Sequence, residues 1–430
     1  MGVLIKNGRV IDPANSVDRL CDLFAAEGKI QAAGENLPAR PDDQVIDAED
    51  CWVVPGLIDL HTHLRDPWNA PPYKETIATG TLAAAAGGFT TVCCMPNTLP
   101  YADSPEVVRY ITERASETER VRVLPVAGIT KGQLGGALAP MTELAAAGAC
   151  AFSEDGRSVA DENLMREALK RAAALCVPVF AHCEDVGMII SGASVHDGIA
   201  ARRFGLAGIS SRSEFSVVRR DCALAAETGA RLHICHVSAA ESVEIIREAV
   251  RKQSAGRRSI TAEVCPHHFA FCDGDISDDG KFKMNPPLRS RADRDALLEG
   301  LRDGTLNIIA TDHAPHLAEE KSRGLSGSAF GVVGLETAVG AGVTYLVRAG
   351  VMGVSDWVAA MTVSPARVLG IEGGTLSEGS AADITIINPD ARYRVDAGKF
   401  FSLGKSTPFD GTELWGKVTH TICNGKVVYR

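Results

Sequence analysis

Apolar residues occur along the middle of this chain in two alternating patterns. Short runs rich in Val, Ile, Phe and Cys have the length of buried β-strands, and most of the segments between them repeat their apolar positions with helical spacing. The predicted strands are Val53–His63, Phe89–Asn97, Arg122–Thr130, Ala149–Gly156, Pro178–Asp185, Arg231–Ser238, Ser259–His268 and Leu306–His316. The predicted helices between them include Lys74–Ala86, Asp161–Ala174, Glu214–Thr228, Ala239–Val250 and Arg291–Arg302.

Strand–helix units in series indicate an α/β fold. Eight such units favour a (β/α)8 TIM-like barrel over a doubly wound sheet, although an open sheet with a similar number of strands fits the same pattern.

The two ends of the chain have a different pattern. Before Pro55 and after Gly370, short β-like runs are separated by turn residues such as Asn-Gly and Glu-Gly. We expect these ends to meet as one small β-sandwich domain. The predicted division is 1–55 for its N-terminal part, 56–370 for the barrel and 371–430 for its C-terminal part.

Composition narrows the class of protein. An apolar content of 45% and a charged content of 23% are ordinary for a globular protein, and the net charge of −10 argues against a nucleic-acid partner. The N-terminus reaches a charge too early for a secretory leader, and no apolar run approaches the length of a membrane span. We therefore expect a cytoplasmic protein without membrane contact, in which the twelve cysteines are mostly buried free thiols.

Metal-binding side chains follow the predicted strands. His61 and His63 occupy alternate positions and therefore face the same way, so both imidazoles can reach one ion. On a barrel the carboxyl ends of all strands share one face, where catalytic groups gather. A catalytic zinc usually has three protein ligands, so six candidates suggest two ions with Asp155 as a bridge. The six are His61, His63, Asp155, His182, His236 and Asp312.

Several motifs together resemble a known family. DLHTHLRDP, GGFTTVCCMPNTLP, FSEDG, AHCED, HICHVS, CPHHF, KMNPPLR and ATDHAPH are similar to the metal-dependent cyclic amidohydrolases, and more narrowly to the bacterial class I dihydroorotases. The resemblance runs from about Pro55 to Thr337. HxH alone is shared by the whole superfamily, whereas GGFTTVCCMPNTLP with KMNPPLR is specific.

The resemblance implies a dihydroorotase that interconverts L-dihydroorotate and N-carbamoyl-L-aspartate in pyrimidine synthesis by means of a metal-bridging hydroxide. It implies two zinc ions, one held by His61, His63 and Asp312, the other by His182 and His236, with Asp155 between them. Asp312 would be the catalytic acid–base. The implied substrate contacts are His63, Arg65, Asn97, Asn285, His316, Phe330 and Gly331. A homodimer and a complex with aspartate transcarbamoylase are further expectations.

Some features leave alternatives open. The family commonly has REPG where this chain has RDPW, which changes the loop near Trp68. We interpret Cys235, His267 and His268 as neighbours of the site rather than ligands, and Leu317–Ala329 as either a mobile lid or a plain surface loop. A hydantoinase or allantoinase would share the chemistry without needing a clamp for a carboxylate. A non-catalytic scaffold is the other alternative, and the complete ligand set argues against it.

Overall fold

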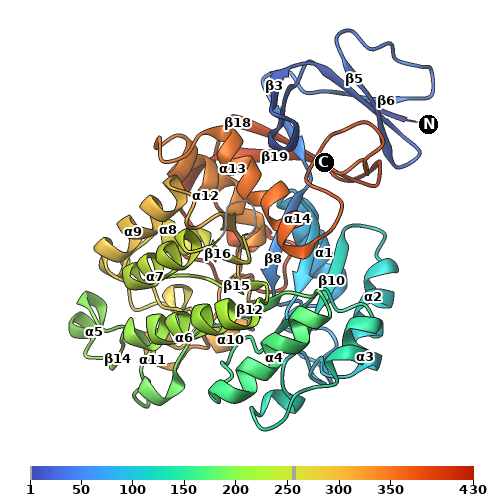
Figure 1. Ribbon diagram of the computed structural model, residues 1–430. Coiled ribbons are helices and arrows are strands. Elements are labelled where there is room, and N and C mark those ends of the chain that lie inside the picture. Colours follow the sequence, from blue (N-terminus) through green and yellow to red (C-terminus); the bar gives the residue numbers. More distant parts are fainter. Residues whose placement is uncertain (1, 254–257) are drawn as a thin grey trace.

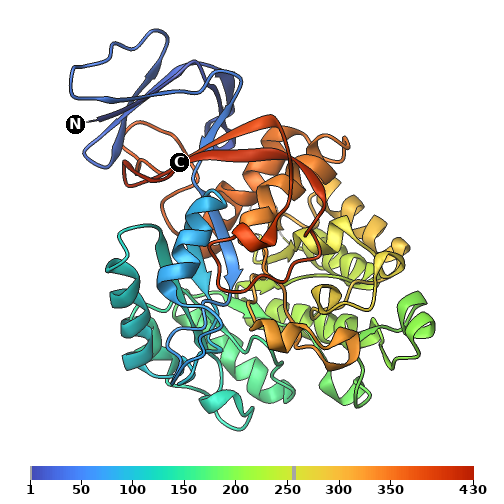
Figure 2. The same ribbon diagram turned by 180° about the vertical axis from the view of Figure 1, so that it is seen from behind.

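The computed structural model describes residues 2–253 and 258–430, so Met1 of the predicted segment 1–55 lies outside the described residues. Figures 1 and 2 show a helix-wrapped barrel with a β-rich region at one side, built from the blue N-terminal and the red C-terminal parts of the chain.

Eight parallel strands form the barrel sheet, in the order β17-β16-β15-β12-β11-β10-β9-β8. The first and last strands approach each other beyond β17, where Thr62 makes a parallel bridge with His313 and the His63 N–H donates to the His313 carbonyl at 2.8 Å. The predicted eight-stranded barrel is confirmed. Its strands are β8 Leu57–Thr62, β9 Phe89–Cys94, β10 Arg122–Gly128, β11 Ala151–Ser153, β12 Val179–Ala181, β15 Leu232–Ile234, β16 Ile260–Val264 and β17 Ile308–Ile309.

Helices between the strands cover the outside of this sheet (Figure 1). Some of them begin at a side-chain cap, and others are held by the apolar residues that they bury. Asp161 caps α4 by accepting the N–H groups of Asn163 and Leu164, and Val243 and Ile246 of α7 are buried against the barrel. The principal helices are α1 Ile77–Ala86, α2 Pro105–Ser116, α3 Met141–Ala146, α4 Glu162–Ala174, α6 Arg212–Thr228, α7 Ala240–Arg251, α9 Arg291–Arg302, α12 Ala338–Gly342, α13 Val354–Met361 and α14 Val363–Leu369.

The strands are shorter than predicted. The run Val53–His63 is divided at Gly56 into β7 (Trp52–Pro55), which belongs to another sheet, and β8 of the barrel. A Cβ at Gly56 would lie 2.2 Å from Thr90 Oγ1, so only glycine allows this close approach. The run Ser259–His268 ends early because Pro266 begins the short helix α8 (Pro266–Ala270).

Both chain ends contribute to the β-rich region, as predicted. A six-stranded sheet has the order β20-β19-β18-β7-β2-β3, and a four-stranded sheet has the order β5-β4-β1-β6. Residues of both sheets, including Ile5, Val53 and Ile384, share one buried cluster. The strands are β1 Gly2–Lys6, β2 Arg9–Asp12, β3 Val17–Leu20, β4 Asp22–Ala26, β5 Lys29–Gly34, β6 Gln44–Asp47, β7 Trp52–Pro55, β18 Ile384–Arg394, β19 Glu413–Cys423 and β20 Lys426–Tyr429.

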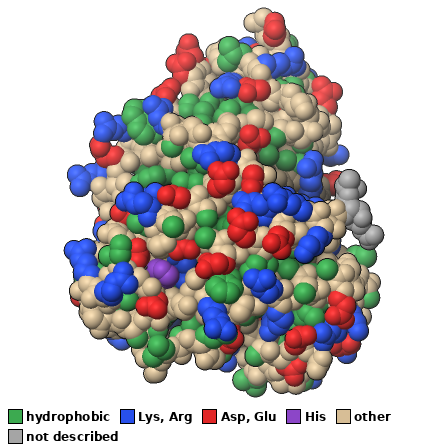
Figure 3. All heavy atoms as spheres, turned by 60° about the vertical axis from the view of Figure 1, so that its left-hand side comes forward, with side chains coloured by type: hydrophobic (Ala, Val, Ile, Leu, Met, Phe, Trp, Pro, Cys, Tyr) green, Lys and Arg blue, Asp and Glu red, His purple; other side chains and the backbone are tan. Residues whose placement is uncertain are grey.

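The surface mixes charges of both signs, and Figure 3 shows acidic and basic side chains interspersed over one face. Within the described ranges, no helix has the length and apolarity needed to cross a membrane. All twelve cysteines are free thiols and ten are buried. The cysteines are therefore mostly buried, as predicted, and the exposed Cys176 follows the end of α4.

Candidate metal centre

The predicted ligands meet just beyond the carboxyl ends of the barrel strands. Asp155, which follows β11, lies at the centre of four histidines. His61 Nε2 lies 3.2 Å from its Oδ1, and His63 Nε2 lies 3.3 Å from its Oδ2. On the other side, His182 Nδ1 and His236 Nε2 lie 3.4 and 3.7 Å from Oδ1. One carboxylate therefore faces two pairs of imidazoles.

Asp312 joins only one of these pairs. Its Oδ1 lies 3.1 Å from His63 Nε2 and 3.4 Å from His61 Nε2. Both histidines also face Asp155, so the structure brings together two groups of side chains that share this carboxylate. All six side chains are buried.

The geometry of these atoms fits divalent cations. Zinc bonds of about 2.0–2.1 Å place tetrahedral ligand atoms about 3.4 Å apart, close to the separations here. His61 Nε2 and Asp155 Oδ1 are buried and have no hydrogen-bond partner among the described residues. His182 Nδ1 and His236 Nε2 face each other at 2.9 Å, although a bare imidazole nitrogen is an acceptor. Ions between these atoms would satisfy all of them.

Charge in the cluster favours ionised carboxylates. Burial alone would raise the pKa of Asp155, but His61 and His63 outweigh it and hold that pKa well below its usual range. Burial likewise opposes the ionisation of Asp312, and the same two histidines keep its pKa low. Both carboxylates are thus ready to bind a cation at neutral pH.

Two acceptors fix the orientation of the first histidine pair. His63 Nδ1 donates to the Asn97 side-chain oxygen at 2.8 Å, and His61 Nδ1 donates to Glu263 Oε1 at 2.7 Å. With the proton on Nδ1, the lone pair of each Nε2 would be free to bind a cation that the carboxylates also bind. Asn97, predicted as a substrate contact, therefore also orients a candidate ligand.

Glu263, in β16, was missed by the sequence reasoning. It is fully buried, accepts the backbone N–H of His236 at 3.1 Å, and its second oxygen lies 2.8 Å from His233 Nε2. A lone acid in an otherwise apolar strand was the signal that could have identified it, since such a group is not buried without partners.

A cavity of about 370 Å³ opens beside the cluster. Its lining contains most of the predicted substrate contacts, together with Glu184, which was not predicted. His316 is not among the lining residues: its Nε2 lies 2.7 Å from the Phe330 carbonyl oxygen. The predicted residues that do line the cavity are His63, Arg65, Asn97, Asp155, His182, His236, Asn285, Asp312, Phe330 and Gly331.

Arg65 reaches the cavity by a route that differs from the predicted one. Strand alternation beyond His63 would put it on the metal-facing side, but β8 ends at Thr62 and Arg65 has a left-handed backbone with φ of 55°. Its Nε is buried without a hydrogen-bond partner in the described part of the chain. Asp66 does not pair with it, because that carboxylate accepts the Ile77 N–H and the Tyr110 hydroxyl. Arg65 thus offers a positive charge to the cavity.

The remaining candidates lie around the cluster. Cys235 is a buried neighbour of His61, and burial raises the pKa of its thiol. His267 and His268 are buried, and burial lowers the pKa of His268 to about 4 while its Nε2 faces the Pro286 carbonyl. In the loop where RDPW replaces the family's REPG, the Lys74 ammonium lies 5.6 Å from the centre of the Trp68 ring.

A barrel with histidines and carboxylates gathered at its carboxyl end is the arrangement of a hydrolase of the amidohydrolase class, with a candidate metal site. A family model described as "Amidohydrolase family" matches residues 328–429. Solved structures share the fold: L-hydantoinase from Arthrobacter aurescens has a TM-score of 0.87 at 24% identity, covering 100% of this chain and 96% of its own. Dihydropyrimidinase from Brevibacillus agri NCHU1002 has a TM-score of 0.84 at 23% identity, covering 100% and 95%.

Sequence relatives narrow this class. A model described as "Dihydro-orotase-like" matches residues 51–242. The dihydroorotase of Geobacillus sp. (strain WCH70) is 46% identical over 431 residues, covering 100% of this chain and 99% of the relative. The dihydroorotase of Anaeromyxobacter sp. (strain K) is 46% identical over 430 residues, covering 99% and 98%. This chain belongs to the dihydroorotase family.

Proposed function

We propose that this protein hydrolyses and re-forms the ring amide of L-dihydroorotate, giving N-carbamoyl-L-aspartate, in pyrimidine biosynthesis. The observation that carries the proposal is the position of Arg65, whose charge lies in the same cavity as the candidate metal ligands. L-Dihydroorotate carries a carboxylate on its ring, and a guanidinium can bind it through two parallel hydrogen bonds. Plain hydantoin has no such group.

Six side chains would hold two zinc ions. His61, His63 and Asp312 would bind one, His182 and His236 the other, and the separations of the Asp155 oxygens from all four histidines support a bridging role for that carboxylate. Bound zinc would supply an acidified water and polarisation of the ring carbonyl.

Side chains of the protein would transfer the proton and bind the substrate. Asp312 is kept ionised by His61 and His63, and it would accept a proton from the attacking water and give it to the departing ring nitrogen. Arg65 would clamp the substrate carboxylate, and Asn285 lines the same cavity. Phe330 and Gly331 would contribute backbone contacts at its wall. For His316 to join them, its ring would have to leave the Phe330 carbonyl.

Arg65→Met tests the clamp. Removing one partner of a buried charge pair costs about 2–5 kcal/mol, so kcat/KM for dihydroorotate should fall by roughly 30-fold to several thousand-fold. Zinc content should be unchanged, because Arg65 is not a ligand. A cyclic amide without the carboxylate is the matched control substrate, and its slow turnover should be little affected. Near-normal catalysis of dihydroorotate, or loss of zinc, would contradict the proposal.

Three further expectations remain predictions. The first is the division into domains 1–55, 56–370 and 371–430. Gly56 directly follows β7 and Gly370 caps the end of α14, so both proposed boundaries lie between elements. A homodimer and a complex with aspartate transcarbamoylase can be checked by sedimentation of the protein alone and mixed with that enzyme.

A further inference from the structure

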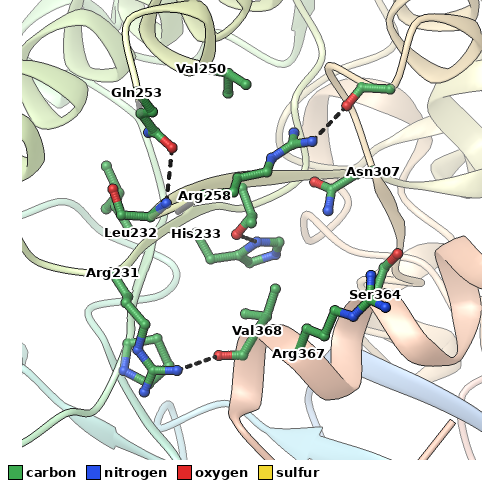
Figure 4. Close-up of a pocket in the computed structure, with 14 residues that line it drawn as sticks. Arg231, Leu232, His233, Val250, Gln253, Arg258, Asn307, Ser364, Arg367 and Val368 are labelled. Carbon is green, nitrogen blue, oxygen red and sulfur yellow. Dashed lines mark hydrogen bonds between the residues drawn. The ribbon is translucent and has the colours of Figure 1, made fainter. Parts of the chain in front are cut away.

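A second cavity, of about 760 Å³, lies at the opposite end of the barrel strands. Its lining includes Arg231, Ser259 and Asn307, each of which directly precedes a strand. The candidate metal ligands lie at or beyond the carboxyl ends, so the proposed reaction uses none of these residues. Figure 4 shows Arg231, Arg258 and Arg367 approaching the cavity from different sides, with the His233 ring and the Asn307 amide between them.

The charge of this cavity is one-sided. Of the lining residues that the structure describes, three are arginines, one is a histidine and none is Asp or Glu, although the whole chain carries a net charge of −10. Among the described residues, none of the three arginines forms an ion pair. The positive charge is therefore available to a ligand.

Backbone carbonyls hold two of these guanidinium groups in place. Arg231 donates to the carbonyls of Val368 and Cys176, the former at 3.3 Å. Arg258 donates at 2.7–3.1 Å to the carbonyls of Ile260, Gly304 and Thr305. A guanidinium has five N–H donors, so both groups retain free donors. Carbonyls fix their orientation without cancelling their charge.

We propose that this cavity binds a small organic phosphate. Planar guanidinium forks match phosphate oxygens, and Asn307 and Ser364 offer further polar contacts. Leu232, Val250 and Val368 supply apolar wall for the organic part. The volume lies within the range typical of small-molecule sites. This site goes beyond the proposed ring hydrolysis and does not depend on it.

Calorimetric titration of the zinc-loaded protein tests the proposal, with inorganic phosphate and adenosine monophosphate as probes. We expect saturable binding of both, tighter for the nucleotide because it also contacts the apolar wall. Arg367→Gln should raise the nucleotide Kd by about tenfold or more, since hydrogen bonds to charged groups are worth about 1.5–3 kcal/mol. Arg367 is exposed and makes no hydrogen bond to a described residue, so the fold should tolerate the change.

Two more variants test whether binding depends on the charge of this cavity. Asn307→Asp keeps the side-chain shape but adds a negative charge to the cavity, and it should abolish binding. Arg109→Gln removes the same charge from the exposed face of α2 and should leave the Kd unchanged. Absence of saturable binding, equal binding of citrate, unchanged affinity in Arg367→Gln or Asn307→Asp, or equal weakening in Arg109→Gln would each overturn the proposal. If the nucleotide bound at the metal centre instead, its Kd would be the same in Arg367→Gln and Asn307→Asp as in the unchanged protein.

Discussion

Glu263→Gln should weaken zinc binding although Glu263 is not a proposed ligand. One oxygen of Glu263 accepts from His61 Nδ1 at 2.7 Å and from the His236 N–H at 3.1 Å, and the other lies 2.8 Å from His233 Nε2. Burial alone would raise the pKa of Glu263, but His61 and His233 lower it to about 2, so the group is an anion at neutral pH. Glutamine keeps the shape but can accept on one side only.

The size of the effect follows from the His61 tautomer. If the new amide N–H groups face His61, its proton moves to Nε2, the atom that faces Asp155 at 3.2 Å. If they face His233, His61 still loses a charged acceptor. Losing such a supporting carboxylate usually costs 10–100-fold in metal affinity, about 1.4–2.8 kcal/mol. We therefore expect a zinc Kd raised by about that factor and a partial recovery of kcat/KM when zinc is in excess.

Competition with a chromophoric chelator measures the affinity, and thermal unfolding of the metal-free protein measures stability. Glu214→Gln is the matched control, because Glu214 is another buried carboxylate, paired with Arg289 away from the cluster. It should lower stability without changing the zinc Kd. An unchanged zinc Kd in Glu263→Gln, or equal shifts in both variants, would refute the reasoning.

Three other predictions concern the site and its border. Asp155→Ala should lose at least one zinc and nearly all activity. Glu154→Ala should have a milder effect, because Glu154 faces away and accepts the Thr130 N–H at 3.0 Å. Elemental analysis with a turnover assay would distinguish the two variants, and full zinc content in Asp155→Ala would contradict the bridging role. Glu320→Gln should reduce the free energy of unfolding by about 1 kcal/mol at pH 7, because Lys74 outweighs burial and lowers the pKa of Glu320 to about 2. That contribution is complete above about pH 4.5 and disappears as the pH falls toward 2, so denaturant titrations of variant and wild type should converge in acid; a constant difference would exclude the ion pair. Leu317–Ala329, predicted as a loop, contains the short helices α10 (Ala318–Lys321) and α11 (Gly324–Gly327); if it is a lid, a substrate analogue should slow its hydrogen exchange, and unchanged exchange would leave it a surface segment.

The six candidate ligands could be found from the sequence because each follows an apolar run, and parallel strands of a barrel end on one face. The path by which Arg65 reaches the cavity could not be read from strand alternation, since β8 ends at Thr62 and Arg65 itself has a left-handed backbone. The sequence could mark Glu263 as an unusual acid within a strand but could not give its partners, because His61 and His233 lie 202 and 30 residues away and only the closed barrel brings them together. The division at Gly56 was hidden for a similar reason: the apolar pattern is continuous there, and the change of sheet depends on contacts with Thr90.

The division at Gly56 also affects the order in which this protein can fold during synthesis on the ribosome. β7 lies between β2, which is translated earlier, and β18, which the ribosome completes only after the whole barrel. Throughout that interval one edge of β7 has no strand to pair with, and unpaired strand edges invite association between nascent chains. β7, which continues into barrel strand β8, therefore gains its second neighbour only from residues that are translated long after its own.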